Sequence, residues 1–269
     1  MLTQYEHHAA IRQNKDCPYL LRIGKNIRDT VCNWHQNIEM FLITNGQGQI
    51  RCGANEYPLS PSDVVVVNSG TVHRIYSETG IDYYCVIIDE QFCKENGLDT
   101  EHCRFSERFC DPRTEALFLQ MIALMTKNER ESSQVETAKL RIAILTLLVD
   151  LFENHLPDPR NTVEQSSRSD EYVKKALLYI NEHYTSPITL DEIAAAVGVS
   201  KFHLERAFKK YTDQTIFTYL NILRCKNAAQ CIRDGMTVTQ AAYENGFESL
   251  SYFSRIYKKL MGSSPSKSV

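Results

Sequence analysis

The sequence predicts a two-domain protein of the α+β class, with an N-terminal β-barrel that carries a helical hairpin and an all-α C-terminal domain. Three observations predict this arrangement. The 269 residues suffice for two domains of ordinary size. Short runs of β-branched and aromatic residues fill the stretch from Tyr19 to Asp89, and apolar residues at helical spacing follow from Arg113. A polar, non-periodic stretch then precedes a last segment in which every element is expected to be helical.

Composition and cysteine usage indicate an ordinary globular protein of a reducing compartment. Hydrophobic residues make up 43% of the chain and charged residues 23%, as in typical soluble domains. The cysteines are odd in number and form no C-x-x-C pair, so no disulfide framework is expected. No run of 18 apolar residues occurs, and the first ten residues lack the basic-then-apolar order of a signal peptide. We therefore expect a cytoplasmic location and no membrane partner.

Five short runs between Tyr19 and Asp89 predict β-strands, because they are rich in β-branched and aromatic residues. They cover residues 20–23, 40–44, 49–52, 64–67 and 83–88. The sequence Asn45-Gly46-Gln47-Gly48 predicts a hairpin between the second and third runs, since glycine allows the positive φ that a tight turn needs. Many short strands with closely spaced turns predict a small barrel or sandwich.

Two amphipathic helices and a linker follow the strands. Four apolar side chains between residues 117 and 125 share one helical face, and five between residues 140 and 151 share the next. The polar stretch between them predicts a helical hairpin, and Pro157 and Pro159 end its second helix. We place the first domain at residues 1–157, a flexible linker at residues 158–169 and the second domain at residues 170–269.

The C-terminal domain contains two helical units that begin in the same way. Thr189 with Glu192, and Thr237 with Gln240, each form the pattern of a capping box. In such a box a hydroxyl and a side chain three residues later satisfy the free N–H groups at a helix start. The two boxes therefore predict that similar units begin 48 residues apart.

Both units predict a helix-turn-helix, in which the second helix lies in the major groove of DNA. A turn at Gly198 precedes the second helix of one unit, and a turn at Gly246 precedes that of the other. In each second helix an apolar stripe is left to face the core, and the opposite side carries cations. A long helix over residues 215–234 joins the units and would hold both second helices about one DNA turn, roughly 34 Å, apart.

The distribution of charge along the chain favours nucleic-acid binding by its C-terminal part. The whole chain has a formal net charge of −3. Residues 170–269 carry 13 Lys and Arg against 10 Asp and Glu, whereas residues 1–169 carry 17 against 23. The positive surplus therefore lies in the part of the chain that carries the two helix-turn-helix units.

These two units resemble a known family. The segments from Ser200 to Lys210 and from Gly246 to Pro265 are similar to the first recognition helix and the C-terminal signature of the AraC/XylS family of transcription regulators. The resemblance implies that six side chains face bases and that four lysines contact phosphates, which position the protein without specifying sequence. The base-facing residues would be Phe202, Glu205, Arg206, Leu250, Ser251 and Arg255, and the phosphate-binding residues Lys201, Lys209, Lys258 and Lys259.

The second unit departs from the family pattern at three positions. The family usually has aliphatic residues where Ala241 and Asn245 stand, and phenylalanine where Tyr257 stands. These departures concern how the second unit packs.

The N-terminal stretch resembles a cupin barrel, which makes the predicted barrel cupin-like. The resemblance rests on the segments 34–39, 61–63 and 70–73. In that fold two histidines and a glutamate can converge on a metal, and such a set forms an open triad suited to Fe(II). Barrel histidines more often hydrogen-bond a ligand or the backbone, and the barrels of AraC/XylS regulators typically sense a small molecule, often a sugar. We therefore expect His35, Glu39 and His73 to line an effector pocket, with no bound metal.

The expected function is that of a sequence-specific DNA-binding transcription regulator that responds to a small metabolite, such as a sugar, and activates rather than represses. Its expected partners are double-stranded DNA, the small-molecule effector, RNA polymerase and a second copy of the chain, the homodimer resting on family analogy. No catalytic residue and no cofactor are expected, because the sequence has no Gly-rich phosphate loop, nucleophile elbow or H-E-x-x-H motif. Two alternatives stay open: a cupin-type metalloenzyme with a structural helical tail, and a constitutive regulator whose barrel is only a dimer scaffold.

Overall fold

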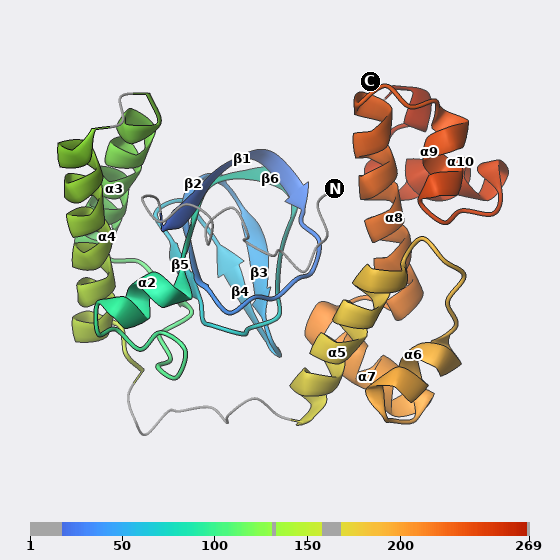
Figure 1. The fold of residues 1–269 in the computed structure, drawn as a ribbon, viewed down its shortest axis with the longest axis horizontal. Helices are drawn as coiled ribbons and strands as arrows, with labels where there is room; N and C mark the ends of the chain where they lie inside the picture. Colours follow the sequence, from blue (N-terminus) through green and yellow to red (C-terminus); the bar gives the residue numbers. More distant parts are fainter. Residues whose placement is uncertain (1–17, 131–132, 158–167, 268–269) are drawn as a thin grey trace. The chain divides into compact units, whose positions relative to one another are not determined.

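The computed structural model describes residues 18–130, 133–157 and 168–267. These residues divide into two compact units, a barrel with two long helices and a C-terminal group of helices, as the α+β prediction requires (Figure 1). The predicted linker at residues 158–169 lies outside the described residues except for its last two, which begin α5 (Arg168–His183). Within the described ranges, no helix is long and apolar enough to cross a membrane.

One antiparallel sheet curls into the nearly closed barrel of the first unit. In the described part of the chain its strands are β1 (Tyr19–Asp29), β2 (Ile38–Gly46), β3 (Gly48–Cys52), β4 (Asn55–Leu59), β5 (Val64–Val67), β6 (His73–Ile88) and β7 (Arg108–Phe109). Their order is β4-β3-β6-β2-β5-β7, and β1 also pairs with β6. The long strand β6 is therefore the element around which the barrel is organised.

The hairpin predicted at residues 45–48 is wrong, because β2 and β3 pair with β6 and not with each other. Gly46 lies opposite Ile81 of β6, and Gln49 lies opposite Tyr76. Since β6 is 16 residues long, its two halves pair with the two consecutive strands in turn. The glycine at position 46 lies against the carbonyl of Gly80, where a Cβ would have no room, so it lets the chain turn a corner without reversing it.

Side chains on the central strands point alternately to the two faces of the sheet, and both faces are buried. On β2, Met40 and Leu42 belong to the core shared with the long helices, whereas Phe41 and Ile43 belong to the core inside the barrel. Successive side chains on a strand point to opposite faces, so Glu39 points into the barrel with Phe41. The sheet thus places the Glu39 carboxyl group among the side chains that fill the barrel.

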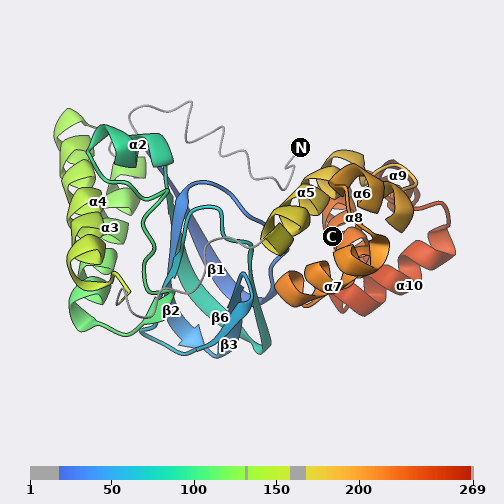
Figure 2. The same ribbon diagram turned by 90° about the horizontal axis from the view of Figure 1, so that it is seen from below.

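Helices α3 (Pro112–Arg130) and α4 (Gln134–Asn154) confirm the predicted helical hairpin. The pair lies along one side of the barrel, with the short α2 (Glu90–Glu95) nearby (Figures 1 and 2). Met121, Met125, Ile144 and Leu148 are fully buried in the core that the helices share with the sheet. Ser133 caps α4 by accepting a hydrogen bond from the N–H of Glu136.

The C-terminal unit is helical and contains both predicted helix-turn-helix units. After α5, its helices are α6 (Leu190–Val197), α7 (Lys201–Thr212), α8 (Ile216–Arg233), α9 (Val238–Glu244), α10 (Leu250–Met261) and a last 3-10 turn, η2 (Pro265–Lys267). Both capping boxes are present, at the starts of α6 and α9. Ser200 and Ser249 cap α7 and α10, the second helices of the two units.

Candidate functional site

Helix α7 exposes the face that the sequence assigns to DNA. Leu204 and Phe208 are fully buried against the rest of the unit. On the other side Phe202 is 72% exposed, and Glu205 and Arg206 are also exposed. A large exposed aromatic ring beside a guanidinium group is more typical of a surface that contacts base edges than of one that contacts only water.

The two lysines assigned to phosphates on α7 differ in their surroundings. Lys209 is exposed, as a phosphate contact requires. Lys201 is half-buried, and its Nζ lies 3.0 Å from a carboxylate oxygen of Asp191 in α6. That carboxylate partly neutralises Lys201, so Lys209 is the better placed of the two for the predicted phosphate contact.

Helix α10 exposes a cationic face with no acidic residue in it. Ser251, Arg255, Lys258 and Lys259 are all exposed. The guanidinium carbon of Arg255 lies 5.5 Å from the ring centre of Tyr252, a cation–π contact that holds the arginine along the helix. Leu250 differs from these, since it is half-buried and packs against the core of the second unit.

A joint that the sequence did not reveal connects the two helix-turn-helix units. Arg224 of α8 donates hydrogen bonds to the carbonyls of Tyr184 (2.6 Å) and Ser186 (2.8 Å), in the loop between α5 and α6. Its guanidinium group also faces the ring of Phe247, in the turn of the second unit, at 5.8 Å. Gly246, at a φ of 81°, lies so close to the same loop that a Cβ would come within 2.7 Å of the Tyr184 carbonyl.

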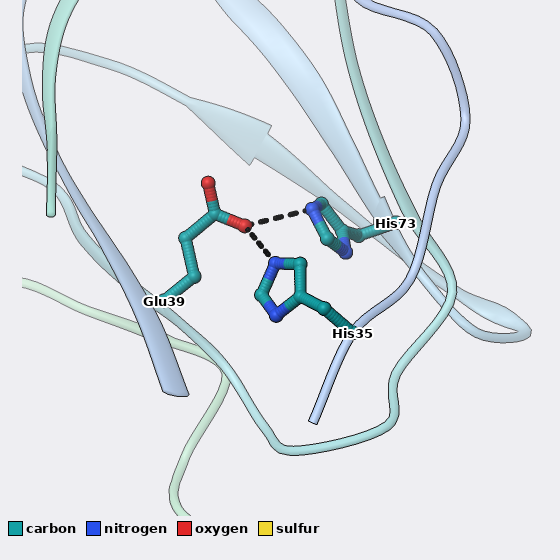
Figure 3. A group of neighbouring side chains, drawn as sticks. All are labelled: His35, Glu39 and His73. Carbon is teal, nitrogen blue, oxygen red and sulfur yellow. Dashed lines mark hydrogen bonds and ion pairs between the residues drawn. The ribbon is translucent and has the colours of Figure 1, made fainter. Parts of the chain in front are cut away.

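Three buried ionisable side chains converge inside the barrel (Figure 3). His35 comes from the segment before β2, Glu39 from β2, and His73 from the first position of β6. The Nε2 atoms of His35 and His73 lie 2.9 and 2.8 Å from the same oxygen, Oε2 of Glu39. The structure thus brings together the three residues that the sequence predicted to act together.

The electrostatics of this cluster favour an ionised glutamate. Burial raises the pKa of the Glu39 carboxyl, but His73 and His35 outweigh burial, so that its pKa lies well below the ordinary value. Cys85 of β6 donates from Sγ to the other carboxylate oxygen, Oε1, at 2.9 Å. This thiol could not be predicted from the sequence, because its approach depends on the register of β6 against β2.

Backbone contacts hold the two histidine-bearing loops together. The N–H of Gly70 donates to the carbonyl of His35 at 2.8 Å, and the hydroxyl of Ser69 donates to the carbonyl of Gln36 at 2.6 Å. The amide of Asn68 is in turn bonded in both directions to the backbone of Phe105. The positions of both rings are therefore fixed by the fold.

A second buried cluster lies where the start of α3 meets the end of α4. The Thr114 hydroxyl lies 2.6 Å from an Asp150 carboxylate oxygen and 2.9 Å from Nε2 of His155. Asp111 lies 3.3 Å from the same ring nitrogen, and Arg113 forms a 3.1 Å ion pair with Asp150. Arg113 neutralises Asp150, and the Thr114 hydroxyl lies between that carboxylate and the imidazole of His155, as in a structural clasp.

Comparison with protein-family models assigns both halves of the chain. A model described as "AraC-like ligand binding domain" matches residues 21–148. A model described as "Helix-turn-helix domain" matches residues 193–268. The barrel with its long helices and the C-terminal helices thus each correspond to a recognised domain type.

Relatives named as transcriptional regulators agree with these matches. The chain is 26% identical over 226 residues to the uncharacterized HTH-type transcriptional regulator YbfI of Bacillus subtilis, covering 82% of this chain and 80% of YbfI. It is 28% identical over 222 residues to the HTH-type transcriptional activator Btr of the same organism, covering 78% of this chain and 40% of Btr. A crystal structure of ToxT from Vibrio cholerae O395 superposes with a TM-score of 0.51 at 14% identity, over 93% of this chain and 97% of ToxT, and so shares the fold.

Proposed function

The chain belongs to the AraC family of transcription regulators, and we propose that it binds a specific sequence in double-stranded DNA through α7 and α10 together. Its helix-turn-helix domain and its ligand-binding domain make it a transcription regulator of the two-part kind. One observation carries the proposal of sequence-specific binding. Each second helix turns an exposed face with arginine and lysine away from the core, where the groove and phosphates of a duplex would meet it.

The proposed roles of single residues follow from their exposure. Arg206 and Arg255 read guanine, because a planar guanidinium group bonds O6 and N7 together. Phe202, Glu205 and Ser251 contact neighbouring bases, and Lys209, Lys258 and Lys259 neutralise phosphates. Leu250 and Lys201 contribute least, since one packs into the core of its unit and the other pairs with Asp191.

We further propose that a small metabolite, such as a sugar, binds in the barrel at His35, Glu39 and His73 and shifts the population of the DNA-competent form. The family match to a ligand-binding domain supports an effector of this general kind. We place the protein in the cytoplasm with the DNA, as a homodimer that activates transcription with RNA polymerase. The similarity to Btr, a transcriptional activator, supports activation.

The test is operator binding by the full-length protein after genomic footprinting has identified its sites. We expect Arg255→Ala to lower specific affinity by about 1–3 kcal/mol and to relax the sequence preference at one position only. Arg233→Ala is the matched control, because Arg233 is also exposed but stands at the end of α8, outside both second helices. Equal affinity and unchanged preference in Arg255→Ala would remove that residue from the interface.

The same measurements separate the two alternative functions. A metalloenzyme with a structural helical tail would show turnover and no salt-dependent DNA binding. A constitutive regulator would bind its operator with the same affinity whether or not candidate metabolites are present. The match of residues 193–268 to a helix-turn-helix domain argues against the first alternative.

A further inference from the structure

One of the two arginines proposed to read guanine is held by a neighbouring ring. The guanidinium carbon of Arg255 lies 5.5 Å from the ring centre of Tyr252, one helical turn earlier in α10. The helix contains no acidic residue that could draw the guanidinium group elsewhere. Arg206 of α7 differs, because within the described part of the chain its guanidinium group makes no cation–π contact.

The ring of Tyr252 is itself held by two other segments. Its hydroxyl accepts a hydrogen bond from the side-chain amide of Asn221, in α8, at 3.2 Å. Its ring centre lies 6.2 Å from that of Phe247, which is buried in the turn before α10. Tyr252 is 39% exposed, so packing alone leaves it room to move, and the bond from α8 restricts it. The helix that connects the two helix-turn-helix units thus sets the place of the ring.

The direction in which Tyr252 draws Arg255 suits a base contact. Tyr252 lies in the first turn of α10, on the N-terminal side of the arginine. In a recognition helix the N-terminal residues contact the base edges. The cation–π contact therefore draws the guanidinium group toward the end of the helix that would enter the groove.

Holding the arginine before DNA binds affects how strictly it reads. An arginine side chain has many rotamers, and ordering it against one base costs conformational entropy. The ring completes part of this ordering in the free protein, so a smaller entropy loss remains for the binding step. A guanidinium group in one orientation also discriminates better among bases, because it must meet O6 and N7 of guanine together.

We propose that Tyr252 is a positioning residue for Arg255 and that Asn221 fixes the tyrosine. Neither of the two positioning side chains reads a base. The proposal rests on the proposed binding of DNA through α10, and it adds which residues set the strictness of reading at one base pair. The competing role for Tyr252 is a direct contact of its exposed ring with DNA. The two roles differ in whether the effect of Tyr252 depends on Arg255.

The first measurement is the affinity of the full-length protein for its footprinted operator and for every single-base variant of that operator. Tyr252→Leu keeps apolar bulk but has no ring. We expect it to bind the operator about two- to fivefold more weakly, the size of an exposed cation–π contact. The sequence preference should relax only at the base pair where Arg255→Ala relaxes it. The dependence of affinity on salt should stay as in the wild type, because no phosphate contact is lost.

A double-mutant cycle separates positioning from direct contact. In the Arg255→Ala background, Tyr252→Leu should cause no further loss of affinity, because no arginine is left to position. Tyr252→Phe keeps the ring but loses the bond from Asn221. It should therefore show the same small loss as Asn221→Ala, and the two changes combined should cost no more than either alone.

Two control variants remove similar groups elsewhere in the same unit. Tyr243→Leu removes a tyrosine of α9 that is 54% exposed. Asn227→Ala removes an amide of α8 that bonds the carbonyl of Leu223 in its own helix. Both controls should bind the operator and its single-base variants as the wild type does.

A measurement without DNA keeps this proposal distinct from the DNA-binding proposal. In full-length protein with isotope-labelled arginine, the NMR signal of the Arg255 Nε–H group is assigned by its loss in Arg255→Lys. We expect a ring-current shift and restricted motion of this group, both absent in Tyr252→Leu and both weaker in Asn221→Ala. If Arg255→Ala leaves operator affinity and preference unchanged, the DNA-binding role of Arg255 fails, whatever the signal shows.

The positioning proposal is overturned if Tyr252→Leu weakens binding equally with and without Arg255. It is also overturned if Tyr252→Leu changes neither affinity nor preference while Arg255→Ala changes both, or if the Nε–H signal is the same in Tyr252→Leu and the wild type. Should Tyr252→Leu fail to fold, Tyr252→Phe and Asn221→Ala decide, since both keep the ring and remove only its anchor. An Arg255 signal and a base preference unchanged in both variants would then sink the proposal.

Discussion

Two buried tyrosines in the C-terminal unit differ in one hydrogen bond. The hydroxyl of Tyr219 accepts a hydrogen bond from the Asn181 amide at 3.3 Å. The hydroxyl of Tyr257 is buried without a partner among the described residues, although its ring packs against Phe253. A buried hydroxyl that lacks a hydrogen bond loses its hydration with nothing in return.

Removing the Tyr257 hydroxyl should therefore do no harm. We expect Tyr257→Phe to leave the free energy of unfolding unchanged or to raise it by up to about 1 kcal/mol, because the ring keeps its packing. Tyr219→Phe is the matched control and should lower it by about 1 kcal/mol, because a satisfied buried bond is lost. Urea unfolding of the two variants measures both effects, and a clear loss of stability in Tyr257→Phe would contradict the argument.

At the residue scale, the sequence predicted which side chains lie together only where a motif or a regular spacing links them. His35 and Glu39 were predicted with His73 because their segments resemble a known barrel, and the structure brings all three together. Cys85 was not predicted, because a thiol approaches the carboxylate only through strand register. Helical spacing alone likewise does not show that the first residue of α10, Leu250, turns partly into the core.

At the scale of elements, the loop before α6 is the place where the two helix-turn-helix units meet. Arg224 ties its carbonyls to α8, and the turn at Gly246 packs directly onto it. Burial lowers the pKa of Arg224 from its ordinary value, so its charge is retained at a cost that the two carbonyl bonds offset. The orientation of α6 and α7 relative to α9 and α10 depends on this joint.

Breaking the joint should weaken combined binding more than the binding of either unit alone. Arg224→Lys keeps the charge but not the two-carbonyl geometry, since an ammonium group lacks the planar fork. We expect about 1–3 kcal/mol lower stability and a larger relative loss of affinity for the full operator than for a half-operator. Arg233→Lys, at the exposed end of the same helix, is the control. Equal losses on full and half operators would mean that the joint serves folding only.

Helices were more predictable than strand pairings. The capping boxes at Thr189 and Thr237 formed as predicted, because a cap depends on residues within one turn. The strand β4 and the first half of β6 were not predicted, since Pro58, Glu78 and Gly80 interrupt their patterns. The pairing of β2 and β3 with β6 was missed because partners distant in sequence decide it.

At the scale of the whole molecule, each of the two units has hydrophobic cores of its own. In the first unit, β2, β5 and β6 contribute to two cores, one shared with the long helices and one inside the barrel. In the C-terminal unit, α5 packs on α6 and α7, and α8 packs on α9 and α10. The excess of acidic residues lies in the first unit and the excess of basic residues in the second. A duplex would therefore be attracted to the second unit and repelled by the first, and raising the salt concentration should weaken binding through released counterions.

The rigidity of α8 leads to a prediction about operator spacing. The helix has 18 residues and spans roughly 27 Å, and α7 precedes it directly while α9 follows it. A half-turn insertion of about 5 base pairs between the two subsites would rotate one of them to the far side of the duplex. We expect the full-length protein to bind this operator at least about tenfold more weakly, like an operator with one subsite destroyed.

A full-turn insertion distinguishes a rigid connection from a flexible one. About 10 added base pairs restore the face of the duplex but move the second subsite by roughly 34 Å, a distance that a continuous helix cannot gain. We therefore expect no recovery of affinity in a gel-shift titration, whereas substitutions of the spacer sequence at constant length should have little effect. Recovery at the full turn would show that the two units move independently, and simultaneous reading of adjacent grooves by α7 and α10 would have to be abandoned.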